Sequence, residues 1–389
     1  MIKDITLFLF IKDITLDGGA ERVVINMANK FSPKYKSVHI ISRYKKNSVI
    51  NYELKQNVSV HYLQPRAQYD IWSWRLNPLS RLMGRYLYSI GYTKKMYRLI
   101  DGLVGKEDKA IVLLNGYEIP WYKRKNTFLI GVDHSSFPYL TERKRKCTYF
   151  HRIYSYLERF ITRNLDVVTC LTDSQIKDWE SLGKPVWVMP NFVGTIPQNL
   201  PSYNTRKKVV LSMGRMVDAQ KGFDRLITIF SKIANQFPDW KLRILGKGPL
   251  KEQYVDLVRK LNAETYIEIL DYTSCPEKEY QNASIYAMAS RWEGFPMVLI
   301  EALANGLPAV AFDICYGPSS IIIDNVTGSI VSDGNEEEYC IRLKKIMSDY
   351  EQREKMGKKA HIDIVNRFSS DIVINRWDKL FNSLLYNSL

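Results

Sequence analysis

The chain has 389 residues, of which 46% are hydrophobic and 25% are charged. This composition excludes a disordered chain, and the length predicts two globular domains rather than one. The five cysteines include no closely spaced pair, so they fit neither a zinc knuckle nor a disulfide framework, and a reducing cytosol is the simplest setting.

The net charge of +15 belongs almost entirely to the front half of the chain. Residues 1–190 hold 31 Lys and Arg against 17 Asp and Glu, whereas residues 191–389 hold 25 against 24. A basic half joined to a neutral half suggests one face that meets an anionic partner.

Short apolar runs alternate with helical stretches in the first half, which predicts a parallel α/β domain. The first run is interrupted at its front by Asp4, and no small-residue cleavage site follows it. It therefore predicts a buried strand and not a signal peptide, and no apolar stretch predicts a membrane-spanning helix. The strands predicted here are 5–11, 37–42, 58–63, 110–114, 127–132, 167–171 and 186–189.

The segment 190–205 contains three prolines and no charged residue, which predicts an interdomain linker. A second series of strands then begins, at 208–212, 242–245, 266–270, 285–287 and 309–312. We therefore predict domains at 1–190 and 206–365, a linker at 191–205 and a terminal helix at 366–389. The apolar stripe predicted for that helix is Ile372, Ile374, Trp377, Leu380, Phe381 and Leu384.

Two candidate ligand contacts follow strands of the first domain. Gly18 and Gly19 lie between the first strand and a predicted helix, where a backbone without side chains can approach a phosphate, although paired glycines are also an ordinary turn. His134 follows the strand 127–132, at the sheet edge where open α/β folds bind ligands, although a lone histidine is usually structural. The dinucleotide fingerprint G-x-G-x-x-G is absent, which argues against an NAD enzyme.

Two cations follow the first strand of the second domain. Arg215 can grip phosphate oxygens in a fork, and Lys221 supplies a point charge. Each stands beside a glycine, at Gly214 and Gly222, and together they could neutralise a departing diphosphate. The alternative is that both are surface cations.

Two carboxylates eight residues apart, Glu293 and Glu301, flank a predicted helix start. Pro296 suits a first helical position, and Asn305-Gly306 is a helix stop. Glu293 therefore falls in the loop before the helix, and Glu301 falls within it. The free backbone amides predicted between them, which could seat a phosphate, belong to Met297, Val298 and Leu299.

This layout matches a nucleotide sugar, because one carboxylate can accept from sugar hydroxyls, the amides can hold the diphosphate and the other carboxylate can accept from ribose hydroxyls. The alternative is a pair of solvated residues, since the spacing arises by chance in many chains.

The segment 294–306 resembles the signature of the retaining glycosyltransferases of family 4. The resemblance covers nearly the whole chain, strongly over 209–331 and more weakly over 5–29 and around His134. It implies the GT-B architecture, in which two Rossmann-like domains face each other across a cleft and a C-terminal helix crosses back to the first domain.

The resemblance implies transfer of a hexose or N-acetylhexosamine from a nucleotide diphosphate sugar, taken as UDP-linked, to a lipid-linked or growing surface glycan such as capsule or lipopolysaccharide. By the same resemblance, Glu301 holds the ribose and Tyr272-Thr273 hold the base. The implied catalytic residues are Glu293, His134, Arg215 and Lys221. The implied nucleotide-sugar-binding residues are Gly18, Gly19, Arg215, Lys221, Tyr272, Thr273, Glu293, Gly294, Phe295, Pro296, Met297, Val298 and Glu301.

No cofactor is expected. The sequence contains no Asp-x-Asp pair, the metal-holding motif of the other major glycosyltransferase architecture, so we expect metal-independent stabilisation of the leaving group. The segment from Gly246 to Pro249 departs from the family pattern, with Lys247 in place of an aspartate, and the sequence does not say what this changes.

The basic half also contains a candidate membrane face. Between Arg66 and Arg98 there are seven Lys and Arg against one acid, interleaved with tyrosines and tryptophans, and a second basic cluster covers 143–146. Such segments suit an anionic lipid surface, which predicts a cytoplasmic protein on the inner face of the membrane. The alternative is that the aromatic residues are core. No nucleic-acid motif accompanies the patch, so a nucleic-acid partner is not expected.

Two other functions stay open. One is a sugar-nucleotide epimerase of similar architecture, which would need no acceptor. The other is a sugar-binding relative without turnover.

Overall fold

The computed structural model describes residues 4–16, 18–64, 78–116, 119–134, 162–180, 182–273 and 275–386. The chain divides into two compact units. Unit 1 contains residues 1–190 and 373–389, and unit 2 contains residues 191–372.

Unit 1 is built on a seven-stranded parallel sheet in the order β3-β2-β1-β4-β5-β6-β7. All six residues of β1 and of β4 are buried, as expected for central strands covered on both faces. The strands are β1 (Thr6–Ile11), β2 (Ser37–Ser42), β3 (Val58–Tyr62), β4 (Ala110–Asn115), β5 (Thr127–Val132), β6 (Val167–Cys170) and β7 (Val186–Val188).

Helices of unit 1 cover this sheet and supply its core. They include α1 (Gly19–Phe31), α2 (Pro78–Val104), the short α5 (Ile176–Glu180) and α13 (Ser370–Tyr386). Phe8 and Phe10 of β1 share one hydrophobic cluster with Tyr92 and Tyr97 of α2. These two tyrosines are 1% and 4% exposed, so within the basic stretch ending at Arg98 they belong to the core and not to a membrane face.

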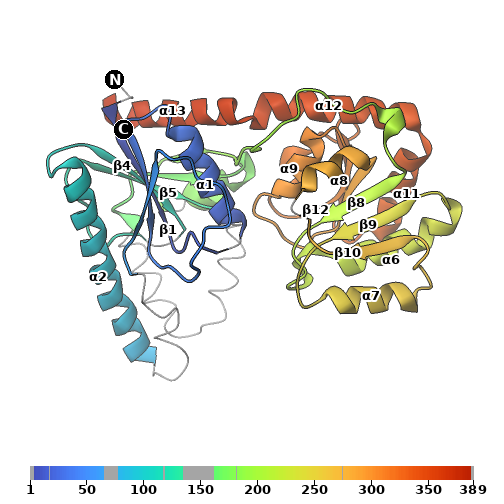
Figure 1. Cartoon of the computed structure of the whole chain (residues 1–389), viewed down its shortest axis with the longest axis horizontal. Helices are drawn as coiled ribbons and strands as arrows, with labels where there is room; N and C mark the ends of the chain where they lie inside the picture. The colour runs from blue at the N-terminus through green and yellow to red at the C-terminus, as the bar shows by residue number, and fades with distance from the viewer. Residues whose placement is uncertain are drawn as a thin grey trace. The chain divides into compact units, whose positions relative to one another are not determined.

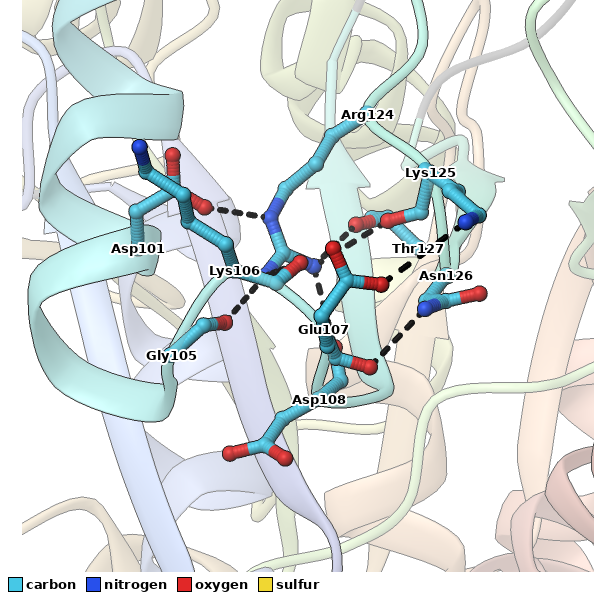
Figure 2. Close-up of polar contacts among 9 residues, drawn as sticks. All are labelled: Asp101, Gly105, Lys106, Glu107, Asp108, Arg124, Lys125, Asn126 and Thr127. Carbon is cyan, nitrogen blue, oxygen red and sulfur yellow. Dashed lines mark hydrogen bonds and ion pairs between the residues drawn. The ribbon is translucent and has the colours of Figure 1, made fainter.

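The buried Arg124 fastens the loop between α2 and β4 to the start of β5 (Figure 2). Its guanidinium donates to Asp101 Oδ1 at 2.7 Å and to the carbonyl of Lys106 at 3.0 Å. It also donates to Thr127 Oγ1 at 3.1 Å and to the carbonyl of Gly105. These contacts lie at the amino ends of the strands, away from the carboxyl ends, where open α/β sheets bind ligands.

Unit 2 is built on a six-stranded parallel sheet in the order β10-β9-β8-β11-β12-β13. Its strands are β8 (Val209–Met213), β9 (Lys241–Leu245), β10 (Ile267–Leu270), β11 (Ile285–Met288), β12 (Ala309–Asp313) and β13 (Gly328–Ser332). In Figure 1, α6 and α7 lie on one side of this sheet, and α8 and α9 lie on the other. The helices of unit 2 are α6 (Phe223–Ile233), α7 (Lys251–Lys260), α8 (Pro276–Asn282), α9 (Met297–Ala304), α10 (Pro318–Ile321), α11 (Glu336–Ser348) and α12 (Tyr350–Phe368).

The twelve strands predicted from the sequence are confirmed to within about two residues at each end, and the two-sheet α/β class is confirmed with them. The strand β13 was not predicted. It begins at Gly328, where an added Cβ would lie 2.3 Å from the carbonyl oxygen of Ala309. The sequence pattern hides this strand because glycine and serine occupy its start, where close packing against β12 demands a small residue.

The single terminal helix predicted from residue 366 is wrong in its start, because α12 ends at Phe368 and a separate helix, α13, begins at Ser370. Ser369 between them has extended dihedrals, which interrupts the helical hydrogen bonds. The return of the chain to the first domain is confirmed, since residues 373–389 belong to unit 1.

Helix α13 packs on α1 through aromatic rings and one ion pair. The ring of Phe31 contacts Trp377 and Phe381, and Lys34 Nζ lies 3.0 Å from Asp378 Oδ2. The predicted apolar stripe is correct except at Ile372, which is 38% exposed, because its neighbour Val373 is the buried residue. None of the helices in the described ranges combines the length and the apolar character needed to span a bilayer.

Candidate functional site

The candidate site of unit 2 lies where its strand order reverses, at the carboxyl ends of β8 and β11. From β8 the sheet grows toward β9 and β10 on one side and toward β11 and β12 on the other. Open α/β sheets bind ligands at such a reversal, outside the carboxyl ends of the strands.

Glu293, in the loop after β11, is buried and carries an ion pair. Its residue exposure is 6%, and Lys221 Nζ lies 2.6 Å from its Oε1. Ser290 Oγ donates to the same oxygen at 2.9 Å. No donor to Oε2 is found among the residues that the structure describes, so this oxygen can accept a hydrogen bond from a ligand hydroxyl.

The backbones of the loops after β8 and β11 contact each other directly. The amide of Arg291 donates to the carbonyl of Gln220 at 2.7 Å, and the Gln220 side-chain amide donates to the carbonyl of Trp292 at 3.1 Å. Gly222 has φ of +61°, and an added Cβ there would lie 1.9 Å from the carbonyl oxygen of Ala289. Glycine is therefore required at position 222 by both conformation and space.

The two predicted diphosphate cations differ in what they contact. The side chain of Lys221 is only 15% exposed and is paired with Glu293, with its methylene groups against the backbone at Gly214. Arg215 is exposed, and no ion pair is found for it within the described ranges. Arg215 is thus the cation directly open to an incoming polyanion, whereas Lys221 first orients a carboxylate.

Helix α9 begins one residue later than predicted. Pro296 is its N-cap, and Met297 is its first residue. The prediction of a free amide at Leu299 is wrong, because that N–H donates to the carbonyl of Pro296 at 3.0 Å. In the described part of the chain, no acceptor is found for the amides of Met297 and Val298, as expected for a first helical turn. The predicted stop is confirmed, with Asn305 as C-cap and Gly306 at φ of +75°.

Glu301 lies within α9, as predicted, and Tyr280 of α8 holds its carboxylate. The Tyr280 hydroxyl donates to Glu301 Oε2 at 3.0 Å, and this tyrosine is 1% exposed.

Phe295, near the start of the segment 294–306, is 7% exposed, and its ring packs on Phe368. Phe295 therefore anchors the loop, while the adjacent Gly294 is half-buried.

The predicted base-binding residues follow β10, next to the loop after β9. Tyr272 is 64% exposed, and Thr273 Oγ1 accepts from the amide of Cys275 at 3.1 Å. Lys247, in the neighbouring loop, is also exposed. The carboxyl ends of β9 and β10 thus expose an aromatic ring, Tyr272, and a cation, Lys247, to solvent.

In unit 1, His134 follows β5 and pairs with Asn115 at the end of β4. His134 Nε2 lies 2.8 Å from Asn115 Oδ1. The Asn115 amide nitrogen donates to the carbonyls of Phe10 and Leu113, each at 3.2 Å. Because the asparagine oxygen must then accept, the proton of this contact lies on His134 Nε2. The sequence reasoning missed Asn115, although an amide residue directly after an apolar run was a usable signal.

Gly18 and Gly19 open helix α1. Gly18 is the N-cap with an extended φ of −147°, and Gly19 is the first helical residue. An added Cβ at Gly19 would meet no atom within 4 Å, so no contact within unit 1 requires a glycine there. A missing side chain at an exposed helix start leaves room for a ligand.

Several of the known proteins that this chain resembles are named as glycosyltransferases. Residues 197–362 match the family described as "Glycosyl transferases group 1". The chain is 26% identical, over 88% of its length and 90% of the relative, to a 4-alpha-N-acetylgalactosaminyltransferase of Campylobacter jejuni that acts on a diphospho-undecaprenol-linked saccharide. It is 31% identical over 57% of its length to an exopolysaccharide phosphotransferase of Streptomyces coelicolor.

The chain spans only 24% of that Streptomyces relative. In fold, it is similar to a mutant of Staphylococcus aureus TarM bound to fondaparinux, α-GlcNAc-glycerol and UDP, with a TM-score of 0.74, 16% identity and coverage of 97% of this chain and 100% of the other. Unit 2 thus contains a segment matching the group 1 glycosyltransferases, and the two parallel-sheet domains have the fold of GT-B glycosyltransferases.

Proposed function

We propose that this chain is a retaining glycosyltransferase that moves a hexose or N-acetylhexosamine from a UDP-linked donor to a hydroxyl of a lipid-linked or growing surface glycan. The observation that carries the proposal is the buried Glu293, oriented by Lys221 where the strand order of unit 2 reverses. The match to group 1 glycosyltransferases supports it, and so does the lipid-linked acceptor named for the Campylobacter relative.

The diphosphate of the donor would lie at the start of α9. The amides of Met297 and Val298 point out of the first helical turn, where the helix dipole favours an anion. Arg215 is exposed at the end of β8 and can grip phosphate oxygens with two N–H groups. These groups oppose the charge that builds on the leaving diphosphate, without a metal ion.

Glu293 would meet the transferred sugar. Its Oε2 accepts from sugar hydroxyls, and its negative charge favours the positive charge that develops at the sugar ring. Lys221 can serve both partners, because an ammonium has three donors and the contact with Glu293 Oε1 uses one of them. Two donors remain for the phosphate oxygens.

The reaction would proceed on one face of the sugar. The bond from the anomeric carbon to the phosphate oxygen breaks, and the acceptor oxygen forms its bond from the same side. The departing phosphate takes the acceptor's proton, so no protein nucleophile is required and the α-linkage of the donor is retained. The other assignments remain those of the sequence: Glu301 with the ribose, Tyr272 and Thr273 with the base, and His134 with Gly18-Gly19 at the sugar and diphosphate.

The acceptor would be bound by the basic half, at the inner face of the cytoplasmic membrane. Exposed cations of α2 support this, namely Lys94, Lys95 and Arg98. The tryptophans of the predicted membrane face and the cluster 143–146 lie outside the described residues.

The test is UDP release from a panel of UDP-sugars, first with water alone and then with lipid-linked saccharide acceptors. We expect slow hydrolysis of one donor, faster release with an acceptor and an α-linked product by NMR. Conversion of the donor to an epimer without any acceptor would replace the proposal with the epimerase. UDP binding without turnover toward any acceptor would leave a sugar-binding protein.

A further inference from the structure

A bidentate ion pair joins the two loops that carry Lys221 and Glu293. Arg291 Nη1 donates to Asp224 Oδ1 at 2.8 Å, and Nη2 donates to Oδ2 at 2.7 Å. Nη1 also donates to the carbonyl of Ala219 at 2.9 Å. Two parallel N–H contacts of this kind fix the relative orientation of the planar guanidinium and the carboxylate more closely than one contact would.

Each member of this pair is a near neighbour of one member of the Lys221–Glu293 pair. Asp224 lies in the first turn of α6, three residues after Lys221, and Arg291 precedes Glu293 by two residues. Within the described residues, the side-chain hydrogen bonds of Asp224 and Arg291 run to each other and to backbone groups, not to Lys221 or Glu293. They can therefore act on the site only through the loops.

The pair persists as charged groups near neutral pH. Hydrogen bonds from Arg291 are the main cause that lowers the pKa of Asp224, and the Asp224 carboxylate raises the pKa of Arg291. Asp224 also stands at the positive end of the α6 dipole, which favours its ionised form.

We propose that Asp224 and Arg291 are positioning residues, whose ion pair holds the Lys221 loop against the Glu293 loop while the donor is bound. This inference rests on the proposed function. The Lys221 ammonium is shared between Glu293 and the proposed diphosphate. The Arg291–Asp224 contact involves no proposed ligand group, so it adds to the backbone contacts between the loops a link on which the donor does not draw.

The test compares Asp224→Asn, Arg291→Gln and the double variant. Asparagine keeps the size of the side chain and removes its charge. We expect each single change to lower kcat for UDP release about tenfold, because a loosened loop misplaces Glu293 relative to the sugar. The double variant should lose no more than the worse single variant, since both changes break one contact. The Kd for UDP should change less than kcat, because the other proposed diphosphate contacts, Arg215 and the start of α9, do not depend on the pair.

Glu336→Gln is the matched control. It removes the 2.7 Å ion pair between Glu336 and Lys232, which also starts from α6 but runs to α11. Its kcat should equal that of the parent, while its melting temperature should fall about as much as that of Asp224→Asn.

Parental kcat in both single variants would overturn the positioning role while leaving the proposed function intact. The positioning role would also be overturned if the kcat loss of the double variant equalled the product of the two single losses, since the two residues would then act separately. A kcat loss in Glu336→Gln as large as that in Asp224→Asn would show that the Asp224–Arg291 pair affects turnover only through the stability of unit 2. If the parent releases UDP from no donor in the presence of any acceptor, the proposed function fails, and the inference fails with it.

Discussion

In unit 1 the strand order reverses between β1 and β4, and in unit 2 it reverses between β8 and β11. The carboxyl edge of unit 2 holds the buried Lys221–Glu293 ion pair close to its reversal. The edge of unit 1 holds a hydrogen bond between His134 and Asn115. Two sheets of one design therefore carry different chemistry, which comes from the side chains that follow the strands and not from the fold.

The buried guanidinium of Arg124 sharpens this contrast. Unit 1 places it at the amino ends of its strands, where backbone carbonyls and Asp101 surround it. Unit 2 places its ion pair at the carboxyl ends. A buried charge at the first edge stabilises the domain, whereas one at the second edge can also act on a ligand.

The largest expected effect on activity is at the carboxyl edge of unit 2, which holds the Lys221–Glu293 ion pair. Glu293→Ala should lower kcat for UDP release by a factor on the order of 100 or more, because the carboxylate is proposed to stabilise charge that exists only in the transition state. The Kd for UDP, measured by calorimetry, should stay close to that of the parent. Glu264→Ala, at an exposed position of unit 2, is the control and should behave as the parent. Equal turnover by Glu293→Ala and the parent would remove the assignment.

The largest expected effect on stability is at the opposite edge of unit 1. Arg124→Ala leaves several carbonyls and Asp101 without their donor and should lower the free energy of unfolding of unit 1 by about 2 to 3 kcal/mol. Denaturant titration would measure this loss. Lys125→Ala, at the next residue in Figure 2, is the matched control. Its ion pair with Glu107 spans 3.7 Å, and both side chains are at least 80% exposed, so its removal should have no measurable effect.

These differences also show what the sequence could predict. Periodicity predicted twelve strands and the stop of α9, because buried strands read as apolar runs and Asn305-Gly306 is a local signal. It could not predict that Lys221 pairs with Glu293, since 72 residues separate them and only the strand order brings their loops together.

Partners that orient the candidate side chains were missed for the same reason. Ser290 and Tyr280 are ordinary residues in the sequence, and their roles depend on contacts with Glu293 and Glu301. The break at Ser369 was missed because one extended residue between two amphipathic helices hardly alters the apolar pattern.

The carboxyl edge of unit 1, which holds His134, should matter less for turnover than the carboxyl edge of unit 2, which holds the Lys221–Glu293 ion pair. His134→Ala removes the imidazole that is proposed to lie next to the sugar, and it should lower kcat about tenfold. His61→Gln is the control, since His61 lies in β3 at the edge of the same sheet. A loss as large as that of Glu293→Ala would mean that the histidine contributes more to the reaction than the comparison of the two edges suggests.

The smallest expected effect concerns the charge difference between the two halves. If the basic half meets anionic lipid, each cation near the surface contributes about 1 kcal/mol at low ionic strength, and salt weakens that contribution. Replacing Lys94, Lys95 and Arg98 of α2 with serine should weaken binding to vesicles with anionic headgroups and reduce its salt dependence. Sedimentation with phosphatidylglycerol vesicles, against neutral vesicles, would measure this.

A matched triple change in unit 2 separates the effect of position from that of total charge. Lys344, Lys355 and Lys359 are cations of α11 and α12, in the half with almost no net charge. Replacing them with serine lowers the net charge equally but leaves the basic half unchanged, so vesicle binding should stay near the parental value. Equal losses in the two triple variants would show that the membrane responds to total charge. The division of charge between the halves would then say nothing about where the acceptor lies.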